Sequence, residues 1–225
     1  MLDDPPPDLT AERPATPAAT VVIVRDATSG LEVLLLRRSD VGAFAGMWVF
    51  PGGRVDDDDA GTDVASRARS AAAREAQEEV ALSCDPDALI PFSHWTPPQS
   101  APKRYATWFF LAPWAGDPPR IDGHEIVDHR WITAGEAMAS DLPMAPPTYV
   151  TLVQLSVYAT LAELTRLAPQ REVEHFTTRS CRVEGELVLL WHGDAGYDHS
   201  DPRATGPRHR LTMARPAWRY ERSPG

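Results

Sequence analysis

The stretch that decides the fold is residues 53–82, GRVDDDDAGTDVASRARSAAAREAQEEVAL. It follows the sharp break Pro51-Gly52-Gly53 and contains neither proline nor glycine from residue 63 to residue 82. Alanine, arginine and glutamate, which dominate this part, are good helix formers. The composition therefore predicts a helix over 63–82.

Acidic residues gather on one side of this helix. At roughly 100° per residue, Glu75, Glu78 and Glu79 are three and four positions apart, which places them on one face. The other side carries the small residues Ala73, Ala76 and Val80. The helix is thus expected to lie close against a sheet while it presents carboxylates.

Three neighbouring like charges destabilise a helix unless a positive charge lies among them. Arg74 is placed to neutralise or orient one carboxylate, and the Pro-Gly-Gly turn exposes backbone carbonyls. Hard oxygen ligands of this kind suit Mg²⁺ or Mn²⁺ better than zinc. A solvated acidic face is the alternative, but this context favours a metal site.

Strands surround the helix in the chain. A hairpin is expected from the aliphatic runs 20–25 and 31–37, and a short strand at 47–50 leads into the turn. Further strands are expected at 89–95, 105–112, 126–132, 186–191 and 209–214. Helices are expected at 133–140, with Thr133 and Glu136 as a capping box, and at 148–167. Without regular βαβ alternation, this order predicts an α/β fold, an α/β/α sandwich around a mixed β-sheet.

The chain of 225 residues suits one domain with an elaborated tail. Residues 1–19 are expected to form a flexible, proline-rich leader. Residues 20–167 form the expected domain, and residues 168–225 a C-terminal extension packed on it.

Net charge and cysteine content limit the classes of partner and the compartment that are expected for this protein. A formal net charge of −10 disfavours binding to nucleic acids or anionic membranes. It leaves a phosphate substrate open, because a bound divalent cation inverts the local field. Two distant cysteines and no apolar run of membrane-spanning length indicate a cytoplasmic protein.

Residues 53–82 resemble the Nudix box, G-x5-E-x7-R-E-U-x-E-E-x-G-U, in which U is aliphatic. The matching residues are Gly53, Arg74, Glu75, Ala76, Glu78, Glu79 and Leu82. Asp59 stands where the first glutamate belongs, fourteen residues instead of seven separate it from Arg74, and Ala81 replaces the final glycine.

The resemblance implies a Nudix fold and a hydrolase that splits diphosphate linkages with Mg²⁺ or Mn²⁺. Metal ligands would be Glu75, Glu78, Glu79 and the Gly53 carbonyl. Catalytic roles would fall to Glu78, Glu79, Arg74 and Glu125, the last as a further metal ligand or base. Glu125 precedes Trp131 by six residues, as a glutamate does in the family.

Several segments resemble the coenzyme A diphosphatase-like Nudix proteins, some of which have an interrupted box. They are LLLRRS (34–39), AFAGMWVFPGG (43–53), WTP (95–97), KRY (103–105) and PPT (146–148). Substrate-binding residues on this interpretation are Arg104, Arg38, Phe44 and Tyr105. An arginine of the commoner coenzyme A signature is replaced by Gly42.

Coenzyme A or an acyl-coenzyme A is therefore the favoured substrate, with ADP-ribose, NADH and nucleoside triphosphates as alternatives. A Nudix module that senses a ligand without cleaving it is a second class. Such a module can dispense with metal carboxylates, which this chain retains, so an enzyme is favoured. The expected partner is a small diphosphate, and a homodimer is left open.

The extra residues before Arg74 are expected to lengthen the box helix at its N-terminal end without changing the register of the glutamates. Deleting residues 63–69, about two turns, should therefore leave measurable turnover once a helix cap is rebuilt. Steady-state hydrolysis by the deletion variant is the measurement. A folded, metal-binding variant without any activity would show instead that the insertion shapes the substrate pocket.

Overall fold

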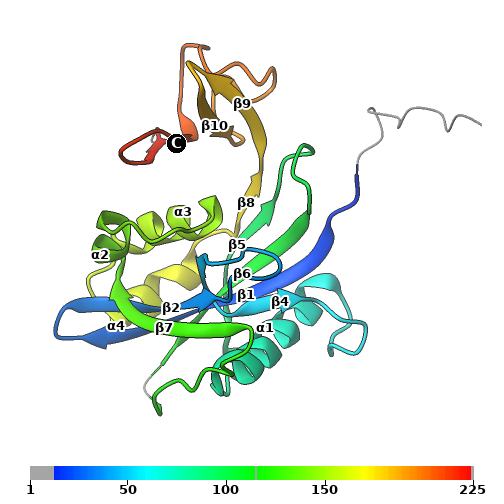
Figure 1. Ribbon diagram of the computed structural model, residues 1–225, viewed down its shortest axis with the longest axis vertical. Helices are drawn as coiled ribbons and strands as arrows, with labels where there is room; N and C mark the ends of the chain where they lie inside the picture. The colour runs from blue at the N-terminus through cyan, green and yellow to red at the C-terminus, as the bar shows by residue number, and fades with distance from the viewer. Residues whose placement is uncertain (1–12, 115, 224–225) are drawn as a thin grey trace, which may run out of the picture.

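The computed structural model describes residues 13–114 and 116–223 (Figure 1). Its strands are β1 (Thr16–Ala27), β2 (Gly30–Arg38), β3 (Trp48–Val49), β4 (Gly52–Arg54), β5 (Ile90–Thr96), β6 (Tyr105–Pro113), β7 (Ile126–Thr133), β8 (Glu174–Thr177), β9 (Arg179–Val183), β10 (Glu186–Leu190), β11 (His209–Met213) and β12 (Arg219–Arg222). Its helices are α1 (Val64–Val80), α2 (Ala134–Ala139), α3 (Pro146–Leu155) and α4 (Leu161–Leu167), with short 3-10 turns at Pro86–Ala88 and Ala168–Gln170.

A mixed, eight-stranded sheet forms the centre of the domain. Its main path is β3-β2-β1-β6-β5-β8, and β4 and β7 pair with β1 and β2 respectively. β1 runs antiparallel to β2 and β4 but parallel to β6. The predicted α/β/α sandwich around a mixed sheet is confirmed.

Each face of the sheet has its own apolar core, as expected from the alternation of side chains along a strand. On β1, Val21 and Ile23 pack with the α1 side, whereas Val22 and Val24 belong to the other core. α1 covers the first face, and α2, α3 and α4 lie on the second (Figure 1).

α1 follows the predicted helix within two residues at each end. Asp63 caps it, because its side chain accepts a hydrogen bond from the Ser66 N–H. The buried face consists mainly of small residues, namely Ala68, Ala71, Ala72, Ala73, Ala76 and Val80. The predicted close approach of helix and sheet is therefore confirmed.

The long helix predicted over 148–167 is wrong, because the chain forms two helices there. α3 ends at Leu155, and Thr160 caps α4 by accepting a hydrogen bond from the Glu163 N–H. The Leu161 N–H donates to the Asp26 carboxylate at 2.7 Å, which ties the start of α4 to the β1–β2 turn. A local cap and a distant acceptor thus break a segment whose composition is helical.

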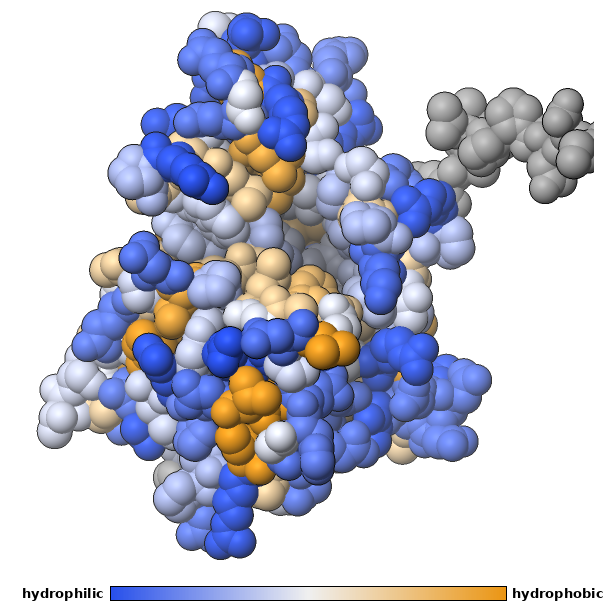
Figure 2. Space-filling view, in the orientation of Figure 1, coloured by the Kyte–Doolittle hydropathy of each residue, from blue (hydrophilic) through white to orange (hydrophobic). Residues whose placement is uncertain are grey.

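The C-terminal residues form a separate antiparallel sheet in the order β12-β11-β10-β9. β8, which the sequence did not indicate, leads into it and joins the main sheet parallel to β5. Trp95 of β5 stacks on Phe176 of β8 with ring centroids 3.8 Å apart, and Trp191 packs edge-on against both. Figure 2 shows a recess between this upper part of the molecule and the main domain.

At the N-terminus, β1 begins at Thr16, inside the segment expected to be a leader, because it pairs there with β6. The first twelve residues of the expected leader lie outside the described part. No helix among the described residues is long and apolar enough to cross a membrane.

The residue that ends α1 makes a testable contribution to stability. Ala81 adopts φ 55°, in the left-handed region, where a side chain is strained and glycine is favoured. Ala81→Gly should raise the free energy of unfolding by about 1 kcal/mol. Urea denaturation followed by tryptophan fluorescence is the measurement.

The control is Gln77→Gly, at an exposed position inside the same helix. There glycine should lower stability by about 1 kcal/mol, because the backbone is helical and glycine has more freedom to lose. Equal effects of the two substitutions would contradict the assigned strain at Ala81.

Candidate active site

The last two turns of α1 bring their carboxylates to the turn at residues 51–53. Glu79 is almost fully buried, with a side chain 6% exposed, and accepts a hydrogen bond from the Gly52 N–H at 3.0 Å. Glu75 is also largely buried, whereas Glu78 is 59% exposed. Two of the three predicted ligands therefore face the Pro-Gly-Gly turn, and the third faces solvent.

Gly53 leaves the room that Glu75 occupies. A Cβ added at Gly53 would overlap the carboxylate of Glu75, with Oε2 2.7 Å away. Only glycine can therefore stand at this position without displacing the carboxylate. The box glycine and the first glutamate of the helix therefore lie against each other in the fold.

Arg74 binds several acidic side chains at once. It donates to Asp59 from Nε at 3.0 Å and from Nη2 at 3.2 Å, and from Nη1 to Glu75 at 2.8 Å and to Glu78 at 3.2 Å. Hydrogen bonds to Asp59 and Glu75 raise the pKa of Arg74, so the guanidinium stays charged. Arg74 therefore lies among the acidic side chains and binds three of them.

Asp59 is an integral part of this cluster. Its side chain is 4% exposed, although neighbouring Asp56 and Asp57 are exposed. Burial acts to raise the pKa of the Asp59 carboxyl, but hydrogen bonds from Arg74 and from the Asp56 N–H outweigh burial and lower it. The acid in the position of the first box glutamate thus reaches Arg74 despite the longer spacing.

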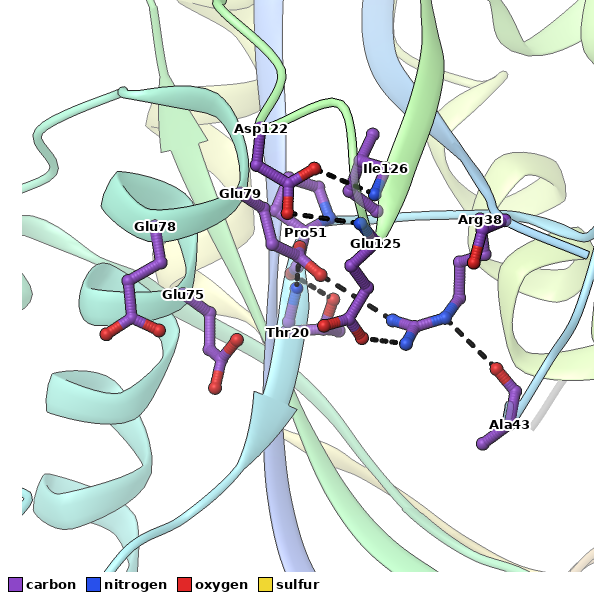
Figure 3. Close-up of polar contacts among 12 residues, drawn as sticks. Thr20, Arg38, Ala43, Pro51, Glu75, Glu78, Glu79, Asp122, Glu125 and Ile126 are labelled. Atoms are coloured by element: carbon purple, nitrogen blue, oxygen red, sulfur yellow. Dashed lines mark hydrogen bonds and ion pairs between the residues drawn. The ribbon is translucent and has the colours of Figure 1, made fainter. Parts of the chain in front are cut away.

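Arg38 reaches the carboxylates from the opposite side, at the end of β2. Its Nη1 lies 3.5 Å from Glu79 Oε1, and its Nη2 contacts the Glu125 carboxylate (Figure 3). Its Nε donates to the Ala43 carbonyl at 3.0 Å. The structure therefore brings Arg38, Glu79 and Glu125 together, which no local sequence signal indicated.

Asp122 is a site residue that the sequence analysis missed. Its carboxylate accepts hydrogen bonds from the backbone N–H groups of His124, Glu125 and Ile126, and its own N–H donates to the Glu79 carbonyl. These bonds fix the loop that carries Glu125 beside α1. The available signal was the Asp-Gly pair at 122–123, which is typical of a turn.

Electrostatics around Glu79 favour a bound cation. The pKa of Glu79 is raised to about 8, first because the carboxyl is buried and further because Glu75 and Asp122 lie nearby. The Gly52 N–H and Arg38 oppose this shift only in part. Burial raises the pKa of Glu75 as well. A buried carboxylate pair of this kind is ionised at neutral pH when a cation binds to it.

The carboxylate oxygens of Glu75 and Glu79 suit a hard divalent ion. The turn carbonyls are less open than the sequence predicted, because the Pro51 carbonyl accepts hydrogen bonds from the Val21 N–H and the Thr20 hydroxyl, and Gly53 pairs with Ala19 of β1. Within residues 13–114 and 116–223, no three acidic, histidine or cysteine side chains already surround a common point at ligand distance. Arg74 and Arg38 instead bind the carboxylates that would act as ligands. The carboxylates are therefore chemically suited to the ion, and Arg74 and Arg38 balance their negative charge in this structure.

Of the four predicted substrate-binding residues, Phe44 and Tyr105 lie near each other. Phe44, on the loop that accepts the Arg38 bond, is 45% exposed, and its ring centroid is 6.5 Å from that of Tyr105. Neighbouring Arg104 is buried and donates to the Pro97 carbonyl at 3.2 Å, while its Nε has no partner. Arg38 alone of the four contacts the carboxylates.

Comparisons with known proteins agree with this architecture. A family model described as "NUDIX domain" matches residues 14–155. No curated protein matches the chain. A Nudix hydrolase from Alicyclobacillus acidocaldarius superposes with a TM-score of 0.61 at 24% identity, over 69% of this chain and 97% of the other.

Two further solved structures are similar in fold. A MutT Nudix hydrolase from Burkholderia pseudomallei gives a TM-score of 0.51 at 21% identity, over 64% of this chain and 99% of the other. The Nudix domain of Shewanella oneidensis NrtR, complexed with ADP ribose, gives 0.52 at 16% identity, over 67% and 94%.

The family match spans more than half of the chain, and its limits enclose β1 to β7 of the main sheet, α1 and the loop that carries Glu125. The matched residues are thus the ones that build the carboxylate cluster. The chain belongs to the Nudix hydrolase family.

Proposed function

We propose that this protein is a magnesium-dependent hydrolase of a nucleoside-diphosphate-linked metabolite, with coenzyme A or an acyl-coenzyme A as the favoured substrate. The observation that carries the proposal is the burial of Glu79 and Glu75 against the turn at 51–53. Two carboxylates this deeply buried are costly unless enough positive charge lies beside them, and Arg38 offsets the burial of Glu79 only in part. Mn²⁺ is the alternative ion.

Glu75, Glu79 and the Gly53 carbonyl would hold the ion, with Glu78 at the solvent side. A bound Mg²⁺ neutralises charge on a diphosphate and lowers the pKa of a bound water. Arg74 keeps Glu75 and Glu78 oriented, because it donates to both carboxylates. Gly52 holds Glu79 in place through its N–H.

In the reaction, a water oxygen forms a bond to phosphorus, and the bridging P–O bond breaks. The electron pair of that bond leaves with the second phosphate. Glu125 is placed to accept the proton of the water, because its side chain is 55% exposed and its loop is fixed beside Glu79 by Asp122.

Arg104 supports the coenzyme A substrate. Its side chain is buried, and no carboxylate of the described residues lies within ion-pair distance of it. A buried guanidinium without a counter-charge is unfavourable, so an anionic group of the ligand is its natural partner. The 3′-phosphate of coenzyme A is such a group, and Phe44 and Tyr105 supply aromatic faces for the adenine.

The metal site is tested by Glu79→Gln, which keeps the volume and removes the charge. We expect kcat to fall by about 10²–10⁴-fold, because a ligand or base is lost. Mn²⁺ binding, measured by the loss of the free-ion electron paramagnetic resonance signal, should weaken in parallel. Glu172→Gln, at an exposed position in the C-terminal part, is the control. Near-normal turnover and unchanged metal binding in Glu79→Gln would refute the site.

The substrate is tested with coenzyme A, dephospho-coenzyme A, ADP-ribose and NADH, with products identified by mass spectrometry. Coenzyme A should give 3′,5′-ADP and 4′-phosphopantetheine. Dephospho-coenzyme A should react with a kcat/KM about 10–100-fold lower, because the charged hydrogen bond to Arg104 is absent. Arg104→Met should abolish this difference, whereas Lys103→Met, at the exposed neighbouring position, should keep it. Equal rates on both substrates, or activity confined to ADP-ribose, would overturn the coenzyme A proposal.

A further inference from the structure

We propose that Arg38 is a built-in counter-cation that pairs with Glu79 and Glu125 and competes with the metal ion for Glu79. The inference rests on the proposed metal site and adds a property that the carboxylates alone do not have. Without an ion the guanidinium pairs with the two acids, and metal binding requires that it move away from Glu79.

The placement of Arg38 shows this role. Its side chain is 15% exposed, and all three of its nitrogens have a partner (Figure 3). Nη1 faces Glu79 Oε1 at 3.5 Å, Nη2 contacts Glu125, and Nε donates to the Ala43 carbonyl at 3.0 Å. The guanidinium therefore lies between two acids that come from α1 and from the loop before β7.

Among the described residues, Arg38 is the basic side chain in ion-pair contact with Glu79. Arg74, the other arginine of the site, is occupied by Asp59, Glu75 and Glu78. A negative charge on a carboxylate 6% exposed is unfavourable without a positive charge beside it. Arg38 offsets that negative charge in part, and a divalent ion in its place would offset more of it.

A divalent ion at Glu79 and the guanidinium at 3.5 Å from the same carboxylate would repel each other strongly in this sheltered site. Binding one therefore weakens the other, and this coupling is reciprocal. The hydrogen bond from Nε to the Ala43 carbonyl involves neither acid, so it can persist when an ion binds. The Nη groups that the ion displaces would then stay near the site, where they can bind a phosphate of the substrate.

The test is Mn²⁺ binding without substrate, by the free-ion electron paramagnetic resonance signal, to the full-length protein and to Arg38→Met. We expect the variant to bind Mn²⁺ about five- to tenfold more tightly, a typical size for coupling between two sites. Arg37→Met is the matched control, because Arg37 is the neighbouring residue but pairs with exposed Asp40. It should change the dissociation constant less than about twofold.

A second variant, Arg38→Gln, keeps an N–H that can reach the Ala43 carbonyl and serves if Arg38→Met does not fold, as judged by circular dichroism. It should also bind Mn²⁺ more tightly. Mn²⁺ affinity that is unchanged or weaker in the folded variant would overturn the inference while the proposed function stands. If the unsubstituted protein binds no Mn²⁺, the proposed function fails, and the competition fails with it.

Discussion

Close packing of the alanine face of α1 against the sheet is the constraint on which the rest of the site depends. Ala72 and Ala76 are fully buried there, so the helix lies near enough for its glutamates to reach the turn at 51–53. Larger residues on this face would lift the helix and remove the contact between Glu75 and Gly53. The position of the carboxylates is therefore a result of core packing and of the absence of side chains on the turn.

The insertion in the box is accommodated without loss of the cluster, because residues 64–73 continue α1 toward its N-terminus and only residues 60–63 form a loop after Asp59. Extending a helix at its N-terminal end leaves the spacing of Arg74 and the glutamates unchanged. The capping of α1 by Asp63 and the bidentate pairing of Asp59 with Arg74 hold this segment in place. Asp59 can thus reach Arg74 although the number of residues between them differs from that of the family's motif.

Local signals predicted the fold well. The hairpin, α1 and the capped helix α2 all follow from periodicity and capping residues within a few positions of one another. Contacts between residues distant in the sequence, such as Arg38 with Glu125 or Leu161 with Asp26, could not be predicted. They depend on how β2 pairs with β7 and on how the helices pack. The four-residue strands β8 and β12 carry too few residues for a clear alternation.

In the site, too, local patterns were predictable from the sequence and long-range contacts were not. The glutamates of α1 and their arginine were predicted because helical spacing places them together, whereas Asp122 acts through backbone hydrogen bonds that no residue pattern reveals. The burial of Arg104 could not be deduced either, because an arginine beside Lys103 has the composition of a solvated loop.

The pairing of β8 with β5 gives the C-terminal residues a protective part in the fold. β5 would otherwise present an open backbone edge along residues 93–96, with Trp95 beside it. An uncovered edge of that kind is a template for pairing with other chains. A chain that ended after α4 would keep every residue of the carboxylate cluster and yet be prone to aggregate, so the solubility of the catalytic domain depends on residues far from its chemistry.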